Sequence, residues 1–553
     1  MESMEMGYVF EDLIRRFSEQ SNETAGEHFT PREVIRLMVN VLFIEDKDIL
    51  TQEGIVKTLY DPACGTGGML SVGEQYVKEL NPKAELKVFG QEINPESYAI
   101  CKSDMLIKGQ DPSNIKFGNT FTVDGLEDEK FDYMLSNPPF GVDWKKAQKV
   151  IKAEAETKGM SGRFGAGLPR INDGSLLFLQ HMISKMKPDG TRIGIVFNGS
   201  PLFTGSAGSG ESNIRKWIIE NDWLEAIIAL PDQLFYNTGI STYIWIVTNH
   251  KSPERKGRVQ LINATGTKDE ELVKEGKIDF NRFWQKMDRS LGDKQKKIAE
   301  NGNEKGIGFI TQLYGNFEEN EFCKIYPNEF FGYWRITVEQ PLRNEQGEIV
   351  RDKKGNPKPD TNLRDYENIP FLREVKQNGK KTLVPQTIEE YFEREVKPHL
   401  PDLPAPKPIA GEYCIYVLKC ADGSFYKGQT NNFPRRMKEH NNGKVSWTSK
   451  KLPVEVIHWE TFKTNEEALK REQYLKTGRG REWLKKQYEK KLLKSFERQA
   501  GAWIDHSKTK IGYEINFTKY FYEFKPLRPL DEIRAEILAL EEKTLELEKK
   551  VLE

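Results

Sequence analysis

Short apolar runs and segments of helical periodicity alternate along residues 55–250. The apolar runs have the length of strands and lie at 55–60, 86–90, 115–117, 131–136, 193–197, 226–230 and 242–247. Helical periodicity is clearest at 176–182 and 214–219. Strands that alternate with amphipathic helices are typical of a sheet with helices on both faces. The pattern therefore predicts an α/β fold with a doubly wound sheet.

A glycine-rich loop follows the first predicted strand. It runs from Asp61 to Gly68, directly before a helix that is predicted to begin near Met69. Glycines in such a turn let the backbone approach a nucleotide-like ligand. Glu92 follows the second predicted strand, close to the offset of about 20 residues at which an acid meets ribose hydroxyls. Asn119 follows the third, where a polar side chain can meet an adenine amino group. The spacing favours a cofactor site.

Asn137, Pro138, Pro139 and Phe140 follow the fourth predicted strand. The Asn137 side-chain oxygen and the Pro138 carbonyl can accept both protons of an exocyclic amine, while the aromatic ring stacks on a base. This arrangement suits a base turned out of its helix. A proline-rich turn that closes a strand is the alternative for these four residues alone.

The segment before the first strand contains two predicted helices, at 10–17 and 34–41. Thr30 and Pro31 stand at the start of the second, Thr30 as its cap and Pro31 in its first helical position. A helix start of this kind presents unpaired N–H groups that suit an anion. An ordinary capped helix is the alternative.

Composition and charge limit the functional classes. The chain has 553 residues, 30% of them charged, with a net charge of -1. Its length predicts several domains, and any nucleic-acid surface must be local. No apolar run approaches the ~20 residues that span a bilayer, and the start is acidic, so we expect a cytoplasmic protein without a membrane partner. The five cysteines show no paired spacing, which indicates neither disulfides nor a zinc site.

The second half of the chain contains a basic module. After a linker rich in Pro, Ala and Lys at 401–410, residues 411–494 hold 19 Lys and Arg against 10 Asp and Glu, with Tyr and Trp interleaved. Such a module is a candidate for nucleic-acid binding, and a solvated basic face is the alternative. Tyr416 and Tyr426 lie on two short predicted strands, Arg436 and His440 share a helix face, and Glu472 lies on a later helix.

The C-terminus is predicted to form a coiled-coil helix. Its apolar positions alternate at spacings of three and four residues over about three heptads: Leu530, Ile533, Ile537, Leu540, Thr544, Leu547 and Val551. A partner helix or packing on the same chain would cover them. Residues 251–400 show weak periodicity and are predicted to be rich in loops.

Three motifs in this order resemble the methylation subunit of type I restriction-modification systems, a class I S-adenosylmethionine-dependent N6-adenine DNA methyltransferase with a Rossmann-like sheet. They are 28–32, 61–68 and 137–140, and the phrases at 190–198, 230–235 and 238–240 match as well. The resemblance implies that S-adenosylmethionine is held by Glu27, His28, Phe29, Thr30, Pro31, Arg32, Asp61, Ala63, Gly65, Thr66, Gly67, Gly68, Glu92 and Asn119. Asn137, Pro138, Pro139 and Phe140 would then hold a flipped adenine of double-stranded DNA.

The same resemblance implies a specificity subunit and a restriction subunit as partners, with the C-terminal helix directed to the specificity subunit. Two features depart from the family. Asn119 stands where the family more often has Asp, and few residues precede Gly26, where the family has a substantial helical domain. No stretch is typical of a target-recognition domain, so the methylated DNA sequence is not predicted.

The basic module resembles the GIY-YIG nucleases, a small α+β fold. The resemblance implies Tyr416 and Tyr426 near the attacking water, Arg436 against phosphorane charge, His440 assisting, and Glu472 binding one Mg²⁺. Cys414 and Lys427 depart from the motif. Residues 331–337, 502–505 and 508–515 resemble the tail of the methylation subunit, so the module is expected to be inserted within that tail.

The predicted organisation has six parts. These are a remnant of a helical region (1–25), the methyltransferase domain (26–255), a loop-rich tail (256–400), a linker (401–410), the GIY-YIG-like insert (411–495), and the resumed tail with its coiled-coil helix (500–553). Two other functions stay open at this point: a catalytically impaired DNA-binding scaffold, and a mobile GIY-YIG endonuclease carried in a methylase.

Overall fold

The computed structural model describes residues 30–521 with internal gaps, the longest at 267–281, 397–412 and 484–502, and three further residues, Arg534, Leu540 and Thr544. The predicted helix at 10–17, the linker at 401–410 and nearly all of the predicted coiled coil lie outside the described residues. The chain divides into two compact units, one of Met1–Asn328 with Tyr513–Glu553 and one of Glu329–Gly512. Among the described residues, no helix combines the length and the apolar character needed to cross a membrane.

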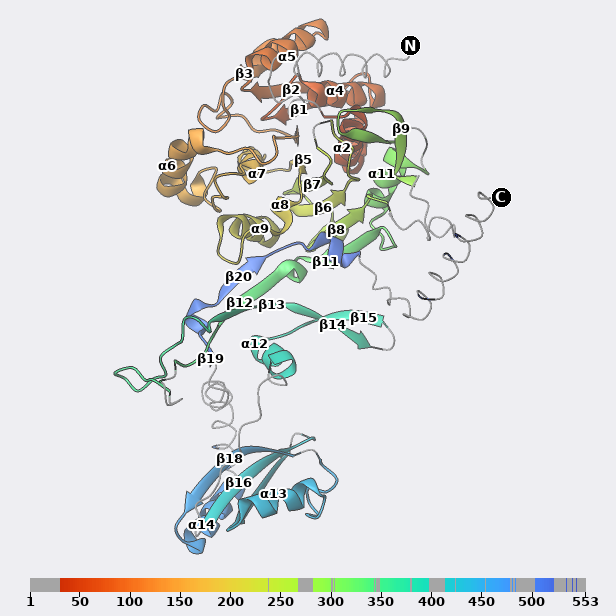
Figure 1. Cartoon of the computed structure of the whole chain (residues 1–553). Helices are drawn as coiled ribbons and strands as arrows, with labels where there is room; N and C mark the ends of the chain where they lie inside the picture. The colour runs from red at the N-terminus through yellow and green to blue at the C-terminus, as the bar shows by residue number, and fades with distance from the viewer. Residues whose placement is uncertain are drawn as a thin grey trace. The chain divides into compact units, whose positions relative to one another are not determined.

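The first unit contains one sheet of nine described strands (Figure 1). In sheet order they are β11 (Cys323–Pro327), β8 (Arg258–Asn263), β6 (Leu224–Ala229), β7 (Tyr243–Thr248), β5 (Arg192–Phe197), β4 (Tyr133–Ser136), β1 (Val56–Asp61), β2 (Glu85–Glu92) and β3 (Ile115–Phe117). Strands β3, β2, β1, β4 and β5 are parallel, and β7 is antiparallel to both of its neighbours. The strand order reverses between β1 and β4, which is where doubly wound sheets bind ligands.

Helices cover both faces of this sheet, as the alternating pattern predicts. One face packs in a single apolar cluster with α2 (Arg32–Phe43), α4 (Gly68–Leu80), α5 (Pro95–Ile107) and α11 (Gly306–Asn316). The other carries α7 (Ser175–Ser184) and α9 (Gly210–Glu220). Every residue of β5, β6 and β7 is buried, which explains their near-continuous apolar sequences.

The remaining elements of the first unit are short or peripheral. They are α3 (Lys47–Leu50), α6 (Gln148–Lys158), α8 (Ser200–Phe203), α16 (Phe517–Tyr520) and the hairpin of β9 (Trp284–Leu291) and β10 (Lys294–Ile298). The sheet continues past residue 255, where the methyltransferase domain was predicted to end, because β8 pairs with β6 and β11 pairs with β8. The loop-rich interpretation of 256–400 is therefore wrong for this part.

The second unit contains a smaller sheet built from both sides of the basic module. Strand β12 (Gly332–Glu339) pairs with β13 (Asp365–Pro370), and also with β19 (Trp503–Ile504) and β20 (Lys510–Tyr513). The hairpin of β14 (Leu372–Gln377) and β15 (Lys380–Pro385) and helix α12 (Ile388–Tyr391) follow β13 along the chain. The chain leaves this sheet before the module and returns to it afterwards, which is the connectivity that an inserted domain requires.

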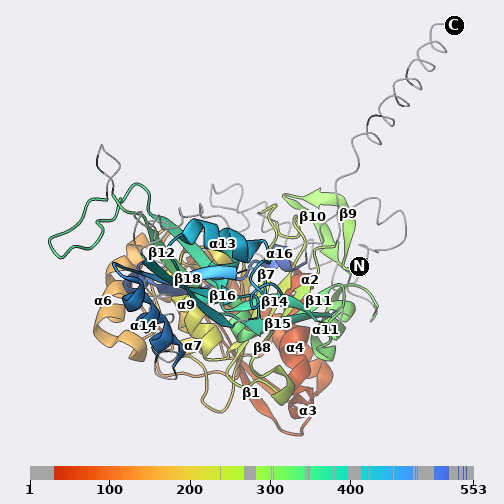
Figure 2. The same cartoon turned by 90° about the horizontal axis from the view of Figure 1, so that it is seen from below.

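The module is a three-stranded antiparallel sheet with helices. Its strands, in the order β17 (Phe425–Thr430), β16 (Tyr413–Cys420) and β18 (Val454–Phe462), accompany α13 (Phe433–Asn441) and α14 (Asn465–Lys476). Ile415 packs with α14 residues, whereas neighbouring Tyr416 packs with Phe433 of α13. Since neighbouring strand residues point to opposite faces, the two helices cover opposite faces of β16 (Figure 2).

Candidate active site

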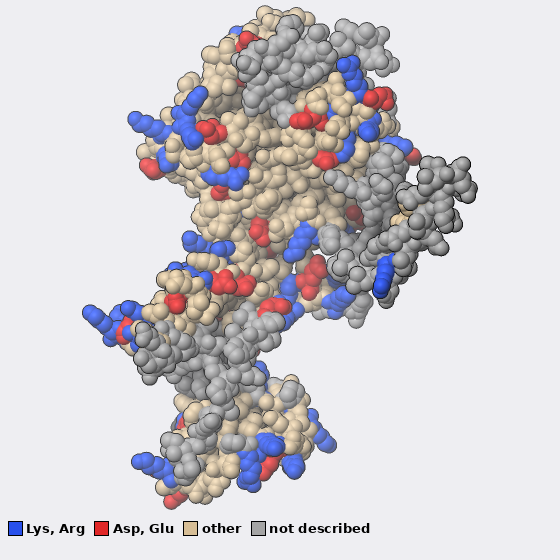
Figure 3. Space-filling model, viewed as in Figure 1, with Lys and Arg blue, Asp and Glu red and all other residues tan. Residues whose placement is uncertain are grey.

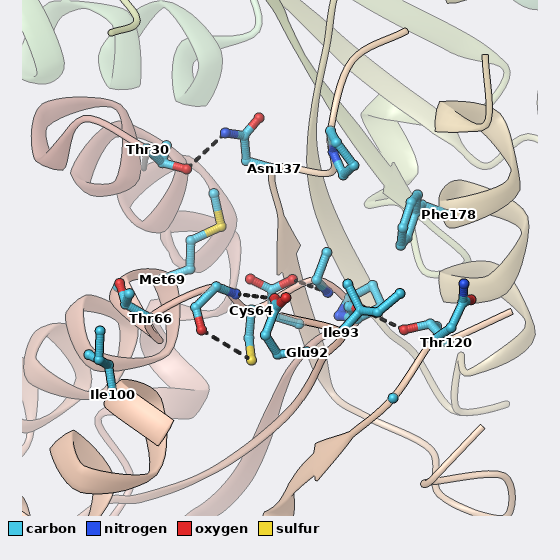
Figure 4. Close-up of a pocket in the computed structure, with 18 of the residues that line it drawn as sticks. Thr30, Cys64, Thr66, Met69, Glu92, Ile93, Ile100, Thr120, Asn137 and Phe178 are labelled. Carbon is cyan, nitrogen blue, oxygen red and sulfur yellow. Dashed lines mark hydrogen bonds between the residues drawn. The ribbon is translucent and has the colours of Figure 1, made fainter. Parts of the chain in front are cut away.

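A cavity of about 900 Å³ opens where β1, β2, β3 and β4 end (Figure 4). It brings together most of the residues that the sequence predicted for the cofactor and the base. Those that line it are Thr30, Arg32, Asp61, Ala63, Gly65, Thr66, Gly68, Glu92, Asn119, Asn137 and Pro139. Glu27, His28 and Phe29 lie outside the described residues, while Pro31, Gly67, Pro138 and Phe140 adjoin lining residues without being part of the lining.

The glycine-rich loop turns directly from β1 into α4. Gly67 occupies the cap position of α4 with a φ of 85°, and Gly65 has a φ of 53°. Side chains rarely adopt such angles. A Cβ atom on Gly67 would also lie 2.8 Å from the Cys101 sulfur. Only glycine tolerates both the positive φ and the close approach of Cys101, so no side chain projects from this position of the loop.

Glu92, the last residue of β2, ties this loop to the sheet. One carboxylate oxygen accepts a hydrogen bond from the Gly65 N–H at 2.8 Å, and the other accepts one from the Asn94 N–H at 2.7 Å. Its side chain is buried in the wall of the cavity. A charged acceptor held by two backbone donors is well placed to accept further hydrogen bonds from ligand hydroxyls.

Asp61, at the end of β1, joins the glycine-rich loop to the end of β4. Its Oδ1 accepts hydrogen bonds from the Ala63 N–H at 3.0 Å and from the Ser136 hydroxyl at 2.8 Å. Burial raises the pKa of this carboxyl to about 7. Ser136 immediately precedes Asn137, so the same carboxylate positions both signature loops. Ser136 had no recognisable signal in the sequence.

Asn137 is oriented by a contact that sequence reasoning did not predict. Its side-chain N–H donates to the Thr30 hydroxyl oxygen at 2.9 Å, as Figure 4 shows, and its Oδ1 is buried without a hydrogen-bond partner within the described residues. The prediction that Thr30 caps α2 is wrong: Pro31 holds the cap position, and no side chain caps this helix. The Thr30 contact engages the Asn137 N–H and leaves the Asn137 oxygen without a hydrogen-bond donor within the described residues. A buried acceptor without a donor lowers stability unless a ligand supplies the hydrogen bond.

Phe140 and Asn119 differ in detail from the expected arrangement. The Phe140 ring lies edge-on to Phe235, with centroids 6.3 Å apart, and it does not line the cavity. The aromatic side chains that line the cavity are Phe121, Trp144 and Phe178. The Asn119 Oδ1 accepts a hydrogen bond from the Phe121 N–H at 2.9 Å, so this side chain also forms a local turn.

Arg163 supports the cavity wall from behind. Its guanidinium donates to the carbonyl oxygens of Thr120 at 2.9 Å and Phe121 at 3.0 Å, and it is paired with Glu154 at 2.7 Å. These contacts hold the segment after β3 in place. Sequence reasoning missed Arg163 because its partners lie on separate elements and no local motif marks it.

A second group of predicted residues comes together in the basic module. The buried Tyr416 hydroxyl lies 3.0 Å from His440 Nε2 and accepts a hydrogen bond from Arg436 Nε at 3.2 Å. The Tyr426 ring lies edge-on to His440, with centroids 4.8 Å apart. Burial, followed by the charge of Arg436, lowers the pKa of His440 to about 4. His440 is therefore neutral at pH 7, and burial raises the pKa of the Tyr416 hydroxyl beside it.

Glu472 lies apart from this group. Its Oε1 accepts a hydrogen bond from Lys476 at 2.6 Å, one turn along α14. The neighbouring buried residues of α14, Ala468 and Leu475, pack with Ile415 on the face of the sheet opposite Tyr416. Within the part of the chain that is described, no three His, Cys, Asp or Glu side chains cluster as metal ligands would. Glu472 thus offers a single carboxylate.

Comparison with known families gives two matches. The family described as N-6 DNA Methylase matches residues 2–305, which is more than half of the chain. The chain belongs to the N-6 DNA methylase family. Residues 412–499 of this N-6 DNA methylase match the GIY-YIG catalytic domain, so both resemblances noted in the sequence are confirmed.

Similar proteins are methylase subunits of type I restriction enzymes. The EcoEI methylase subunit of Escherichia coli is 31% identical over 367 residues, which cover 62% of this chain and 68% of that protein. The HindI subunit of Haemophilus influenzae is 31% identical over 262 residues (47% and 54%), and the MjaIX subunit of Methanocaldococcus jannaschii is 30% identical over 259 residues (47% and 43%). This N-6 DNA methylase thus spans about half the length of the latter two.

A similar solved structure is the type I restriction-modification system methyltransferase subunit from Streptococcus thermophilus. It has a TM-score of 0.44 and 24% identity, and the match covers 55% of this chain and 57% of that one.

Proposed function

We propose that this chain transfers the methyl group of S-adenosylmethionine to the N6 amino group of an adenine turned out of double-stranded DNA. In this proposal it is the modification subunit of a type I restriction-modification complex and acts with specificity and restriction subunits. The observation that carries the proposal is the buried Asn137 Oδ1, which has no partner within the described residues. Thr30 orients its amide, and Asn137 lines the same cavity as Glu92 and the glycine-rich loop.

The residues present fit S-adenosylmethionine. Gly65 and Gly67 keep the loop thin enough for close approach, Glu92 offers carboxylate oxygens, and the cavity of about 900 Å³ has room for a cofactor together with a base. When bound, the cofactor supplies an electrophilic methyl group on a positively charged sulfur. Thr66 and Asn119 complete the wall that would hold it.

The chain's own residues act on the amino group of the base. This nitrogen is a poor nucleophile because its lone pair is delocalised into the ring. By accepting its two protons, Asn137 Oδ1 and the Pro138 carbonyl favour a pyramidal nitrogen whose lone pair points at the methyl group. Phe121, Trp144 and Phe178, which line the cavity, are the aromatic side chains against which the base would stack. The proposed step depends on positioning and needs no strong base.

A methyl-transfer assay tests the proposal. The full chain is incubated with tritiated S-adenosylmethionine and DNA, with and without its specificity subunit. We expect label at adenine N6 when the specificity subunit is present, because nothing in this chain is typical of a target-recognition domain. A chain that binds the cofactor but labels no DNA under either condition would instead be a DNA-binding scaffold, and the proposal would be wrong.

A second candidate activity is DNA cleavage by the GIY-YIG module. The hydrogen-bonded group of Tyr416, His440 and Arg436 favours it, because the Tyr416 hydroxyl would take a proton from an attacking water as it passes its own proton to the imidazole of His440. Glu472 offers one carboxylate for the Mg²⁺ that the resemblance implies, with water completing the coordination, but it lies on the helix that packs on the face of the sheet opposite Tyr416.

For this activity we expect the full chain to nick supercoiled plasmid DNA in the presence of Mg²⁺. Nicking is expected to stop with EDTA and in Glu472→Ala, because both remove the metal. The matched control is Glu466→Ala, an exposed acid in the first turn of the same helix, which should nick like the wild type. A wild-type chain that leaves plasmid intact with Mg²⁺ would remove the nuclease assignment.

A further inference from the structure

The segment that follows Asn137 along the chain lines part of the cavity. Its lining residues include Pro139, Trp144, Lys146 and Ala147, and it leads directly into α6. A base held at Asn137 stays attached to its strand, so the sugar-phosphate backbone on either side of the base must pass close to this segment. The outer surface of α6 is therefore beside the path of the DNA strand.

Helix α6 is firmly attached at this position. Trp144, Ala147 and Ile151 pack with aromatic and aliphatic side chains from three other segments in a small apolar core of their own. Glu154 adds a two-oxygen contact with the Arg163 guanidinium. The inner face of α6 is thus fixed to the cavity wall, and its outer face has a defined orientation.

The outer face of α6, with the turn before it, carries more lysines than acids. Lys145 lies in the 3-10 turn Lys145–Ala147, and Lys149 and Lys152 lie on α6; all three are exposed. One exposed acid, Glu156, lies on the same face as Lys149 and Lys152. Figure 3 shows Lys and Arg side chains over the region of α6, with some Asp and Glu side chains among them. Among the described residues, Lys149 and Lys152 form no ion pair, and Lys145 lies 3.7 Å from Asp143. Seven residues of helix span about 10 Å, or about three nucleotide steps of a DNA strand.

We propose that this α6 face, defined by Lys145, Lys149 and Lys152, binds consecutive phosphates of the DNA strand that carries the flipped base. This inference rests on the proposed function and names the surface that holds its substrate. Lysines act on phosphates as point charges and read no base edges. The face therefore adds affinity for any DNA sequence and leaves the choice of sequence to another subunit.

The salt dependence of DNA binding tests this surface. The full chain is titrated against a fluorescein-labelled DNA duplex of about 30 base pairs at several salt concentrations, with binding read by fluorescence anisotropy. Each phosphate contact contributes about 0.9 to the slope of log affinity against log salt concentration. Replacing all three lysines, as Lys145→Gln, Lys149→Gln and Lys152→Gln together, is expected to make the slope about 2.7 less steep.

Two companion variants separate charge from folding. The same three positions changed to Arg keep their charge and should keep the wild-type slope. Lys47→Gln, Lys83→Gln and Lys87→Gln together remove three exposed lysines near the opposite ends of the strands and should also keep it. Thermal unfolding shows whether each variant is folded.

An unchanged slope in the α6 glutamine variant, a wild-type chain without measurable DNA binding, or an equal effect of the control triple would overturn the proposal. Methyl transfer is not read in this assay. If the proposed function fails, the methyl-transfer assay leaves the DNA unlabelled while the salt slope of the wild-type chain is unaffected. If the α6 proposal fails, only the salt slopes of the variants differ from those expected.

Discussion

Asn137→Ala is expected to lower methyl transfer by about 10²–10³-fold, the usual effect of removing one preorganised hydrogen-bonding group from a dry site. The substitution removes the buried Oδ1 that has no partner within the described residues, and with it an acceptor for the adenine amino group. The cofactor wall around Glu92 is untouched. Single-turnover methylation measures the rate, and calorimetry with S-adenosylmethionine should show close to wild-type affinity.

Thr30 provides the matched controls for this prediction. Thr30→Val removes the oxygen that accepts from the Asn137 amide, so the amide can rotate and the rate constant should fall without a comparable rise in KM for DNA. Thr30→Ser keeps the hydroxyl and should restore the rate. Wild-type turnover by Asn137→Ala would mean that the amino group is held elsewhere.

Glu92→Ala is expected to weaken S-adenosylmethionine binding by about 100-fold. Hydrogen bonds to charged groups contribute about 1.5–3 kcal/mol each, and about 1.4 kcal/mol corresponds to tenfold in affinity. The substitution removes the acceptors for ligand hydroxyls and also leaves the Gly65 and Asn94 N–H groups without their partner. Glu92→Gln keeps one acceptor oxygen and should lose less.

Calorimetry with S-adenosylmethionine measures this effect. Glu96→Ala is the matched control, because Glu96 is exposed in the first turn of α5 and only four residues away. It should bind the cofactor like the wild type. Equal affinity in Glu92→Ala and Glu96→Ala would show that Glu92 does not contact the cofactor.

The parts of the fold that depend on local signals were predictable from the sequence. The strands from β1 to β7 are short apolar runs, and the ends of β1 to β4 carry the loops that meet at the cavity. Strand β8 was missed because Gln260 interrupts its apolar pattern. That side chain is buried and bonded to Arg255 and to the Leu313 carbonyl, and such partners are visible only in three dimensions.

In the candidate site, too, some residues were predictable from local sequence signals and others are revealed only by the fold. Glu92 and Asn137 were predicted because their spacing from a strand carries a chemical meaning. The role of Thr30 was missed because its partner is 107 residues away and its sequence context is that of a helix cap. Phe140 was expected on the base, but the nearby Phe235 offers a ring that no local pattern reveals.

The pairing of β12 with β19 has a consequence for biosynthesis. Val338 pairs with Ile504, so the ribosome must translate the entire module before this contact can form. Until then one edge of β12 stays without its final partner, and an open edge invites pairing between nascent chains. A module that folds by itself as soon as it emerges shortens the effective loop that has to close. Independent folding of the insert would therefore favour completion of its host sheet.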